Sequence, residues 1–138
     1  VTPEASWMRT TPGFSTVTPY FFVRDADRFV SFLVKGFGGT EVLRSLRPDG
    51  RIANAQIRIG TSTIMASEAG DRYPPMPTAC YLYVEDADKA MALALAAGGT
   101  LEMDASDMPY GDRQGGIKDP HGNIWWISQR LIPAPYSA

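Results

Sequence analysis

The residues best suited to chemistry in this chain lie in the segment KDPHGNIWWIS, Lys118 to Ser128, which holds the only histidine. An imidazole can bind a metal or move a proton near neutral pH. Asp-Pro-His-Gly-Asn has the composition of a turn, and Ile-Trp-Trp-Ile that of a buried strand. Because a turn side chain usually meets solvent, we expect the same of His121, with a ligand contact or a role in a dimer as alternatives.

A second polar group, Tyr110, Asp112 and Arg113, precedes a later strand. One interpretation is a structural turn with a surface Asp–Arg pair, worth under about 1 kcal/mol. The other is a pocket rim, at which Arg113 or Arg51 attracts an anionic or carbonyl-bearing ligand. Cys80 has no histidine or cation beside it in the sequence, so we expect a buried structural thiol and not a nucleophile.

The composition describes an ordinary globular chain. At 138 residues, 44% apolar and 20% charged, it has the length of one domain. A net charge of -2 gives no electrostatic reason to bind nucleic acid or an acidic membrane, and the longest apolar runs are too short to span a bilayer. One cysteine cannot form an internal disulfide, and no secretory signal is visible, so we expect the cytoplasm. The chain begins at Val1 without a methionine, which leaves a removed leader open.

Two stretches of the chain repeat each other 61 residues apart. Tyr20 to Arg28, YFFVRDADR, aligns with Tyr81 to Lys89, YLYVEDADK, and after one deleted position GGT at 38–40 aligns with GGT at 98–100. Self-similarity of this kind marks a repeated structural unit. The sequence therefore predicts five segments: a tail at 1–14, a module at 15–67, a Gly- and Pro-rich linker at 68–77, a second module at 78–131, and a tail at 132–138.

Each module is predicted to have the order βαβββ. Asp25 and Asp86 are suited to cap a helix, and the Gly-Gly pairs are suited to end it. In the first module we expect a helix at 26–35 and strands at 17–23, 40–47, 52–59 and 62–67. In the second we expect a helix at 87–97 and strands at 78–84, 100–103, 115–118 and 124–129, with a long turn between 103 and 115. The predicted fold class is α+β, a single domain whose two tandem modules form a curved mixed sheet around a trough.

Side-chain alternation along the strands predicts which residues face the trough. In the strand at 52–59 the polar Asn54 and Gln56 alternate with apolar residues that the helix would cover. Tyrosine carries a polar tip that favours water or a ligand. In the opening strands we therefore assign these residues to the trough: Thr18, Tyr20, Phe22, Ala79, Tyr81 and Tyr83. The alternative register would place Phe21 and Val23 there.

The repeated V-x-D-A-D-[RK] junctions, the doubled βαβββ order and the ending D-P-x-G-N-x-W-x-I resemble the vicinal oxygen chelate superfamily. That superfamily includes glyoxalase I, bleomycin resistance proteins, extradiol dioxygenases and fosfomycin resistance enzymes. TPYFFV at 18–23 and YGDR at 110–113 look most similar to its PhnB-like branch. The resemblance covers residues 16–131 and implies the fold, but one scaffold carries isomerases, transferases, dioxygenases and binders. It also implies a homodimer. Because the tail at 1–14 contains the apolar residues Trp7 and Phe14, we expect that this tail packs across the dimer.

In the superfamily's metal enzymes, ligands come from the first and last strands of each module. The resemblance places those positions at Thr18 and Met65 in the first module and at Ala79 and Trp126 in the second. Zinc, iron and manganese need imidazole, carboxylate or thiolate donors, normally at least three. These four side chains offer none, so we expect no metal, no cofactor and no catalytic residue.

Trp126 is then better interpreted as an aromatic platform for a flat ligand, with filling of a collapsed core as the alternative. The predicted ligand-binding residues are Tyr20, Phe22, Asn54, Gln56, Met65, Tyr81, Tyr83, Tyr110, Arg113, Gln114 and Trp126. The predicted function is metal-independent binding of a planar, apolar or aromatic drug-like molecule, similar to the drug-sequestering members, with antibiotic resistance by sequestration. The alternatives are a glyoxalase- or dioxygenase-like lyase or isomerase, and an interaction module whose trough is filled.

Overall fold

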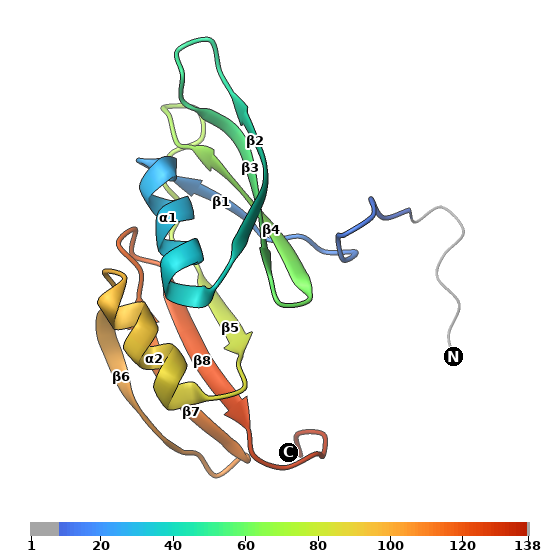
Figure 1. Cartoon of the computed structure of the whole chain (residues 1–138), viewed down its shortest axis with the longest axis vertical. Coiled ribbons are helices and arrows are strands. Elements are labelled where there is room, and N and C mark those ends of the chain that lie inside the picture. The colour runs from blue at the N-terminus through green and yellow to red at the C-terminus, as the bar shows by residue number, and fades with distance from the viewer. Residues whose placement is uncertain (1–8, 138) are drawn as a thin grey trace.

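The chain folds into two βαβββ modules (Figure 1). The structure is a computed structural model and describes residues 9–137. The first module comprises β1 (Tyr20–Val23), α1 (Ala26–Phe37), β2 (Thr40–Leu46), β3 (Ile52–Ile59) and β4 (Ser62–Glu68). The second comprises β5 (Ala79–Tyr83), α2 (Ala87–Ala96), β6 (Thr100–Asp107), β7 (Asp112–Lys118) and β8 (Ile124–Arg130). The α+β class and the tandem modules predicted from the sequence are confirmed.

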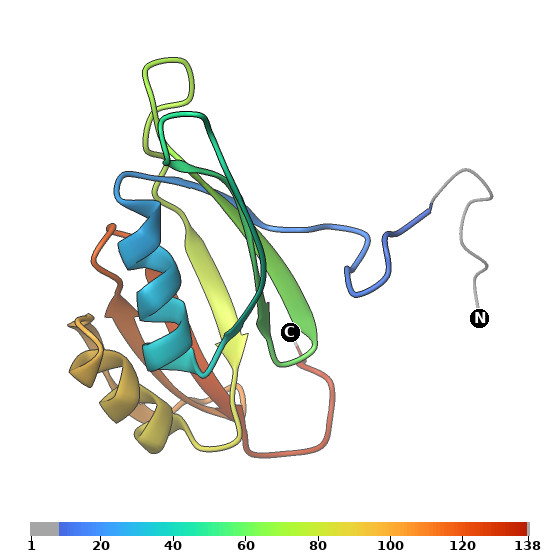
Figure 2. The ribbon, with the colours of Figure 1, turned by 45° about the horizontal axis from the view of Figure 1, so that its top comes forward.

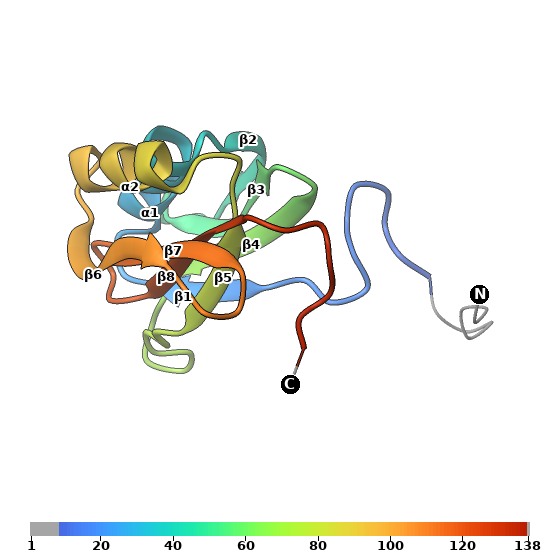
Figure 3. The ribbon, with the colours of Figure 1, turned by 90° about the horizontal axis from the view of Figure 1, so that it is seen from below.

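The strands form two mixed sheets of four, in the orders β1-β4-β3-β2 and β5-β8-β7-β6. β1 and β5 run parallel to β4 and β8, and the remaining pairs are antiparallel. Figure 3 shows both helices on one side of the strands. Each sheet therefore has a helix face and an opposite face, called here the free face.

Both helices begin at the predicted residues, whereas α1 extends two residues past its predicted end at 35 and α2 ends at Ala96, with Ala97 and not a glycine as its C-cap. The Asp25 carboxylate accepts a hydrogen bond from the Arg28 N–H at 3.3 Å, and Asp86 accepts one from the Lys89 N–H at 3.1 Å. α1 ends at Gly38, whose φ of 68° is in the left-handed region that glycine adopts without steric cost. Neither helix within the described residues has the length and apolar character needed to cross a membrane.

The two modules share one hydrophobic core. α1 and α2 lie side by side (Figure 2), and a Cβ added at Gly36 would lie 3.3 Å from the Ala97 Cβ and 3.6 Å from the Ala94 Cα. Small residues therefore allow the helices to approach closely. Between the modules, the Phe21 ring stacks on Trp125 with centroids 5.7 Å apart, and both side chains are buried.

Burial settles the register of the opening strand. Phe21 and Val23 are buried in the core, whereas Tyr20 and Phe22 lie on the other side of β1, on the free face. This is the register preferred from the sequence, and its alternative is wrong. β1 itself begins at Tyr20 and not at residue 17, in keeping with the missing N–H of Pro19.

The predicted long turn between residues 103 and 115 is also wrong. β6 continues to Asp107, and the turn is short, closed by a 2.7 Å hydrogen bond from the Met108 N–H to the Asp112 carbonyl. β6 is an edge strand whose residues are mostly exposed, and its pairing with β7 is interrupted by register shifts after Leu101 and Met103. Its polar sequence therefore lacks the apolar alternation by which a strand is recognised.

Candidate functional site

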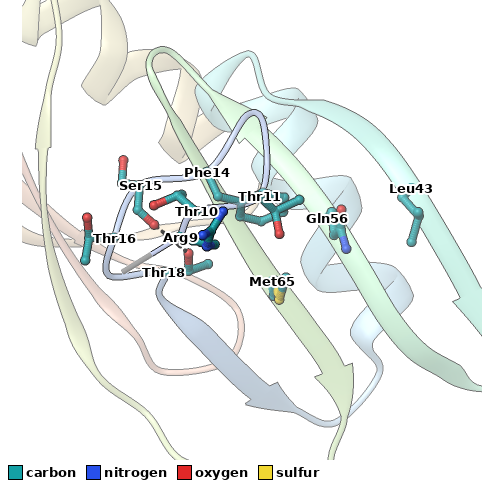
Figure 4. Close-up of a pocket in the computed structure, with 10 residues that line it drawn as sticks. All are labelled: Arg9, Thr10, Thr11, Phe14, Ser15, Thr16, Thr18, Leu43, Gln56 and Met65. Atoms are coloured by element: carbon teal, nitrogen blue, oxygen red, sulfur yellow. Dashed lines mark hydrogen bonds between the residues drawn. The ribbon is translucent and has the colours of Figure 1, made fainter. Parts of the chain in front are cut away.

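A cavity of about 760 Å³ lies on the free face of the first sheet (Figure 4). Three neighbouring strands supply its floor: Leu43 on β2, Gln56 on β3 and Met65 on β4. Gln56 pairs with both of the others, so the three form a row across the sheet. Thr18 and Met65, two of the family's metal-ligand positions, both line this cavity.

The N-terminal segment supplies the other wall. Its lining residues are Arg9, Thr10, Thr11, Phe14, Ser15, Thr16 and Thr18. The segment is fastened to the sheet at Gly13, whose carbonyl accepts hydrogen bonds from Arg58 Nη1 at 2.6 Å and from Thr63 Oγ1 at 2.7 Å. Residues that the sequence analysis placed in a tail thus form part of the cavity. Trp7, the other aromatic residue of that tail, lies outside the described residues.

The free face of the second sheet is occupied by Trp126. A Cβ added at Gly116 would lie 2.6 Å from Trp126 Cζ3, so the indole rests directly on the glycine of the neighbouring strand. Trp126 also pairs with Tyr81 of β5. Trp125, the preceding residue of β8, points the other way into the core, because successive side chains of a strand alternate between its faces.

A polar cluster lies beside Trp126 around Asp112, which is fully buried. Asp112 accepts hydrogen bonds from Tyr81 at 2.7 Å, Arg130 at 2.9 Å and Tyr136 at 2.6 Å. Burial raises the pKa of Asp112, but the hydrogen bonds from Tyr136, Tyr81 and Arg130 outweigh it and hold that pKa below its ordinary value. The carboxylate is therefore ionised at neutral pH and acts only as an acceptor.

Gln114 extends this cluster. Its side-chain oxygen accepts a hydrogen bond from the Tyr110 hydroxyl and lies 3.3 Å from the Tyr81 hydroxyl, whose single proton is directed at Asp112. Burial, the largest cause, together with the neighbouring Asp112 raises the pKa of Tyr81, so its hydroxyl remains a donor. Three predicted ligand-binding residues thus meet on one face, together with Asp112, which was discussed from the sequence but not included in the predicted set.

Three further predicted residues, Asn54, Tyr20 and Phe22, lie on the first sheet. Asn54 accepts a 3.0 Å hydrogen bond from Gln56, and Tyr20 pairs with Met65. Phe22 lies 5.1 Å from the Tyr20 ring by centroid and is stacked by Tyr73 of the linker at 5.4 Å. Phe22 is therefore partly covered by the chain itself.

The predicted set falls into two groups on two sheets. The first-sheet group is Tyr20, Phe22, Asn54, Gln56 and Met65; the second-sheet group is Tyr81, Tyr83, Tyr110, Gln114 and Trp126. Within residues 9–137, no hydrogen bond joins a side chain of one group to one of the other, and of the two groups only members of the first line the cavity of the first sheet. The predicted ligand-binding residues therefore lie on two sheets and not on one.

Arg113 belongs to neither group. It lies between Asp112 and Gln114 along β7, so its side chain points to the helix face, where it binds Asp88 of α2 at 3.0 Å and Asp107 at 3.0 Å. These ion pairs raise the pKa of Arg113. The expected pocket-rim role does not match this placement. Arg113 does form surface ion pairs, but its partners are Asp88 and Asp107 and not the buried Asp112, which pairs with Arg130.

His121 is half-buried between the modules, so the expectation that it meets solvent is wrong. Its Nε2 lies 3.2 Å from the Asp25 carbonyl, and its ring meets Phe29 edge-on at 5.4 Å. The turn is organised by the buried Asp119, which accepts hydrogen bonds from the backbone of His121 and Asn123, the Asn123 amide and the Trp125 indole N–H, all between 2.8 and 3.0 Å. Tertiary packing against α1 draws the histidine inward.

The family's metal positions do not fit a metal. Thr18 and Met65 offer a hydroxyl and a thioether, and Ala79 and Trp126 offer a methyl group and an indole. In the part of the chain that the structure describes, no group of three or more His, Cys, Asp or Glu residues could hold a metal ion. Cys80 is half-buried against the core, and burial raises the pKa of its thiol, in line with the structural role expected for it.

Sequence reasoning missed Phe14, Leu43 and Tyr136. Leu43 was part of a predicted strand, but nothing in the sequence gave the distance between β2 and the N-terminal segment. Phe14 was noted only as an aromatic residue of the tail. Tyr136 lies in a Pro- and Ala-containing tail with no pattern that predicts its contact with Asp112.

The model of the Glyoxalase/Bleomycin resistance protein/Dioxygenase superfamily matches residues 14–127, and the chain belongs to this superfamily. The predicted family is thereby confirmed. Two uncharacterized proteins, of Mycobacterium bovis and Mycobacterium tuberculosis, are each 32% identical over 124 aligned positions. The alignments cover 82% of this chain, and 82% and 73% of the two relatives.

Solved structures show the same fold. TioX from Micromonospora sp. ML1 has a TM-score of 0.69 and 26% identity, over 88% of this chain and 100% of that chain. TnmS3, an antibiotic binding protein from Streptomyces sp. CB03234, has a TM-score of 0.64 and 21% identity, over 83% of this chain and 95% of that chain. The TnmS3 likeness concerns the fold alone.

Proposed function

We propose that the protein binds a small, planar, largely apolar molecule without a metal, in the cavity of the first sheet. The observation that carries this proposal is the cavity of about 760 Å³ at the family's ligand face, lined by Thr18 and Met65 at two metal-ligand positions. Its volume lies within the roughly 300–1,000 Å³ of small-molecule sites. Protection against a toxic compound would then follow from sequestration, one molecule for each site.

The lining supports a ligand with a flat apolar body and a few polar groups. Met65, Phe14 and Leu43 offer apolar surface, and the Met65 thioether adapts to differently shaped partners. Gln56 and the threonines of the N-terminal segment can orient the ligand by hydrogen bonds, and Arg9 adds a positive charge at the wall. Of the first-sheet group of predicted residues, Gln56 and Met65 line the proposed site.

The proposal can be tested with 8-anilinonaphthalene-1-sulfonate, a planar dye that fluoresces on apolar surfaces. We expect saturable binding to the folded protein. Met65→Ala should weaken it by roughly five- to thirtyfold, since the lost apolar contact is worth about 1–2 kcal/mol. The matched control is Met103→Ala. Met103 lies on β6 of the second sheet, where it pairs with Gly116, and this variant should bind the dye with the affinity of the parent.

Dye affinity that is equal in the parent and in Met65→Ala would count against this site. The alternative of a lyase or isomerase of the glyoxalase or dioxygenase kind is tested by metal analysis of untagged protein. A stoichiometric divalent ion would favour it over binding alone. The alternative of a filled interaction module is disfavoured on the first sheet by the size of the cavity, whereas Trp126 fills the same region of the second.

We further propose a homodimer in the cytoplasm. No helix or strand of residues 9–137 covers either free face, and Val42, Leu43 and Leu46 of the edge strand β2 are exposed apolar residues of the kind that interfaces bury. Cys80 has no partner for a disulfide within the chain, which suits a reducing compartment. Size-exclusion chromatography with light scattering tests the dimer; a monomeric mass across a concentration series would overturn it.

A further inference from the structure

The C-terminal segment places the phenol ring of Tyr136 on the free face of the second sheet. The Tyr136 hydroxyl donates a hydrogen bond to Asp112 Oδ2 at 2.6 Å. It also lies 2.8 Å from the Tyr83 hydroxyl. Because the single Tyr136 proton is directed at the carboxylate, Tyr83 is the donor in the second contact. The face thus offers a phenolic hydroxyl both an acceptor and a donor.

The acceptor is a prepared one. Asp112 is fully buried, and its two other side-chain donors, Tyr81 at 2.7 Å and Arg130 at 2.9 Å, fix its orientation. A buried carboxylate binds hydroxyl donors strongly, because a buried carboxylate oxygen without a hydrogen bond costs free energy. The hydrogen bond to Asp112 raises the pKa of Tyr136, so the hydroxyl keeps its proton.

The surroundings of the ring are equally selective. The Arg130 guanidinium carbon lies 4.2 Å from the Tyr136 ring centroid, a cation–π arrangement. The Tyr110 ring lies 6.4 Å away at 65°, with its edge toward Tyr136. The face therefore contacts both parts of the Tyr136 phenol, the aromatic ring and the hydroxyl group.

The segment that delivers Tyr136 is lightly held. Residues 131–137 are exposed and have no regular secondary structure. The segment starts at a 2.9 Å hydrogen bond from the Leu131 N–H to the Gly111 carbonyl, and beyond it the segment is bound through the Ala134 carbonyl, which Arg130 Nη2 reaches at 2.6 Å, and through Tyr136 itself. Tyr136 remains 48% exposed, so its removal would uncover no core. A tethered group competes with free ligand at a millimolar effective concentration, to order of magnitude, which another phenol can exceed.

We propose that the free face of the second sheet is a binding site for a phenol-bearing ligand, and that Tyr136 occupies it when no ligand is present. Asp112 and Tyr83 recognise the hydroxyl group, and Arg130 and Tyr110 recognise the ring. The ligand displaces the C-terminal segment without disturbing the sheet. This site is separate from the cavity of the first sheet and does not depend on it.

Binding of 4-ethylphenol by Tyr136→Ala, followed by calorimetry, tests the proposal. We expect this variant to bind the probe about tenfold more tightly than the parent, because the tethered competitor is gone. It should also prefer 4-ethylphenol to 4-ethylanisole by at least about tenfold, since the methyl ether cannot donate to a charged acceptor. The ether serves as the control ligand and avoids a substitution of Asp112 that could disturb folding.

Equal affinity of the parent and Tyr136→Ala for 4-ethylphenol would overturn the proposal, as would equal affinity of the variant for the two probes. Met65→Ala combined with Tyr136→Ala separates the two sites. It should retain the affinity of Tyr136→Ala for 4-ethylphenol, and its loss would assign the probe to the first cavity. Loss of dye binding by Met65→Ala with 4-ethylphenol binding intact would support this second site by itself.

Discussion

The two sheets have the same strand order and the same pairing of their last two strands, but their free faces differ in the side chains at the matching positions. On the first sheet, Gln56 pairs with Met65 and a cavity of about 760 Å³ lies above them. On the second, Gly116 pairs with Trp126 and the indole lies on the glycine. The volumes of two neighbouring side chains therefore decide whether the same backbone carries a cavity or a filled surface.

The segments outside the repeat differ in the same way. The N-terminal segment stands over the first sheet as a wall, fastened through the Gly13 carbonyl. The C-terminal segment brings Tyr136 down onto the second sheet. A duplicated module can thus evolve two different faces, because the repeat fixes the frame and the unrepeated parts determine access to it.

The largest expected effect on stability comes from replacing Gly116 of the second sheet by glutamine, the residue that stands at the matching position 56 of the first sheet. Gly116→Gln would place a Cβ 2.6 Å from the Trp126 ring, and we expect a loss of about 2–3 kcal/mol in unfolding free energy, measured in urea. Adding Trp126→Met should recover most of that loss, since the pair then matches Gln56 and Met65. An additive double variant would show that the two positions do not oppose each other.

The reverse exchange tests the first sheet. Gln56→Gly with Met65→Trp should lay an indole over the cavity floor and abolish binding of 8-anilinonaphthalene-1-sulfonate, with the far-UV circular dichroism unchanged. Binding that survives this exchange would mean that the pair does not determine the contents of the face.

The next comparison is between a turn of the second module, before β8, and a turn of the first module, between β2 and β3. Asp119→Ala removes the acceptor of four hydrogen bonds and leaves the buried Trp125 N–H unpaired, so we expect a loss of about 2–3 kcal/mol in a thermal or urea unfolding experiment. Asp49→Ala, in a turn of the first module, loses one hydrogen bond from the Arg51 N–H and should cost under about 1 kcal/mol. Equal losses of unfolding free energy in Asp119→Ala and Asp49→Ala would show that the two turns do not differ in their contribution to stability.

A smaller effect is expected at the N-terminal wall. Thr63→Val removes one of the two side-chain donors to the Gly13 carbonyl, worth about 1 kcal/mol, and should raise hydrogen exchange at the Phe14 N–H roughly fivefold. The exposed Thr61→Val, in the adjacent turn, is the control and should leave that exchange unchanged. No change in either variant would mean that Arg58 alone holds the segment.

The smallest expected effect is on the pH dependence of the unfolding free energy, to which Asp112 contributes. The pKa of Asp112 is lower in the folded chain than its ordinary value of 3.8, so below that value the unfolded chain binds the proton more readily. The contribution of Asp112 to stability is complete above that value and is lost as the pH falls through the folded pKa. Urea unfolding from roughly pH 6 to roughly pH 3 should show a flatter slope for Asp112→Asn, and the exposed Asp71→Asn should retain the parent slope.

Much of the frame could be predicted because it depends on local patterns. The repeat at Tyr20 and Tyr81, the capping aspartates and the Gly-Gly ends locate both modules and both helices, and strand alternation assigns Trp125 and Trp126 to opposite sides. The edge strand β6 was underestimated because exposed strands need no apolar alternation. His121 was misplaced because its partners, Asp25 and Phe29, are distant in sequence.

By itself the sequence determined the family, the two modules, the register of the free faces and the absence of suitable donors at Thr18, Met65, Ala79 and Trp126. These features depend on residue type and on spacing within a module. Only the tertiary structure decided that the predicted site divides between two sheets, that Arg113 turns to a helix, and that Tyr136 meets Asp112. Those outcomes depend on how distant segments pack, a balance of volumes and buried hydrogen bonds that no local pattern records.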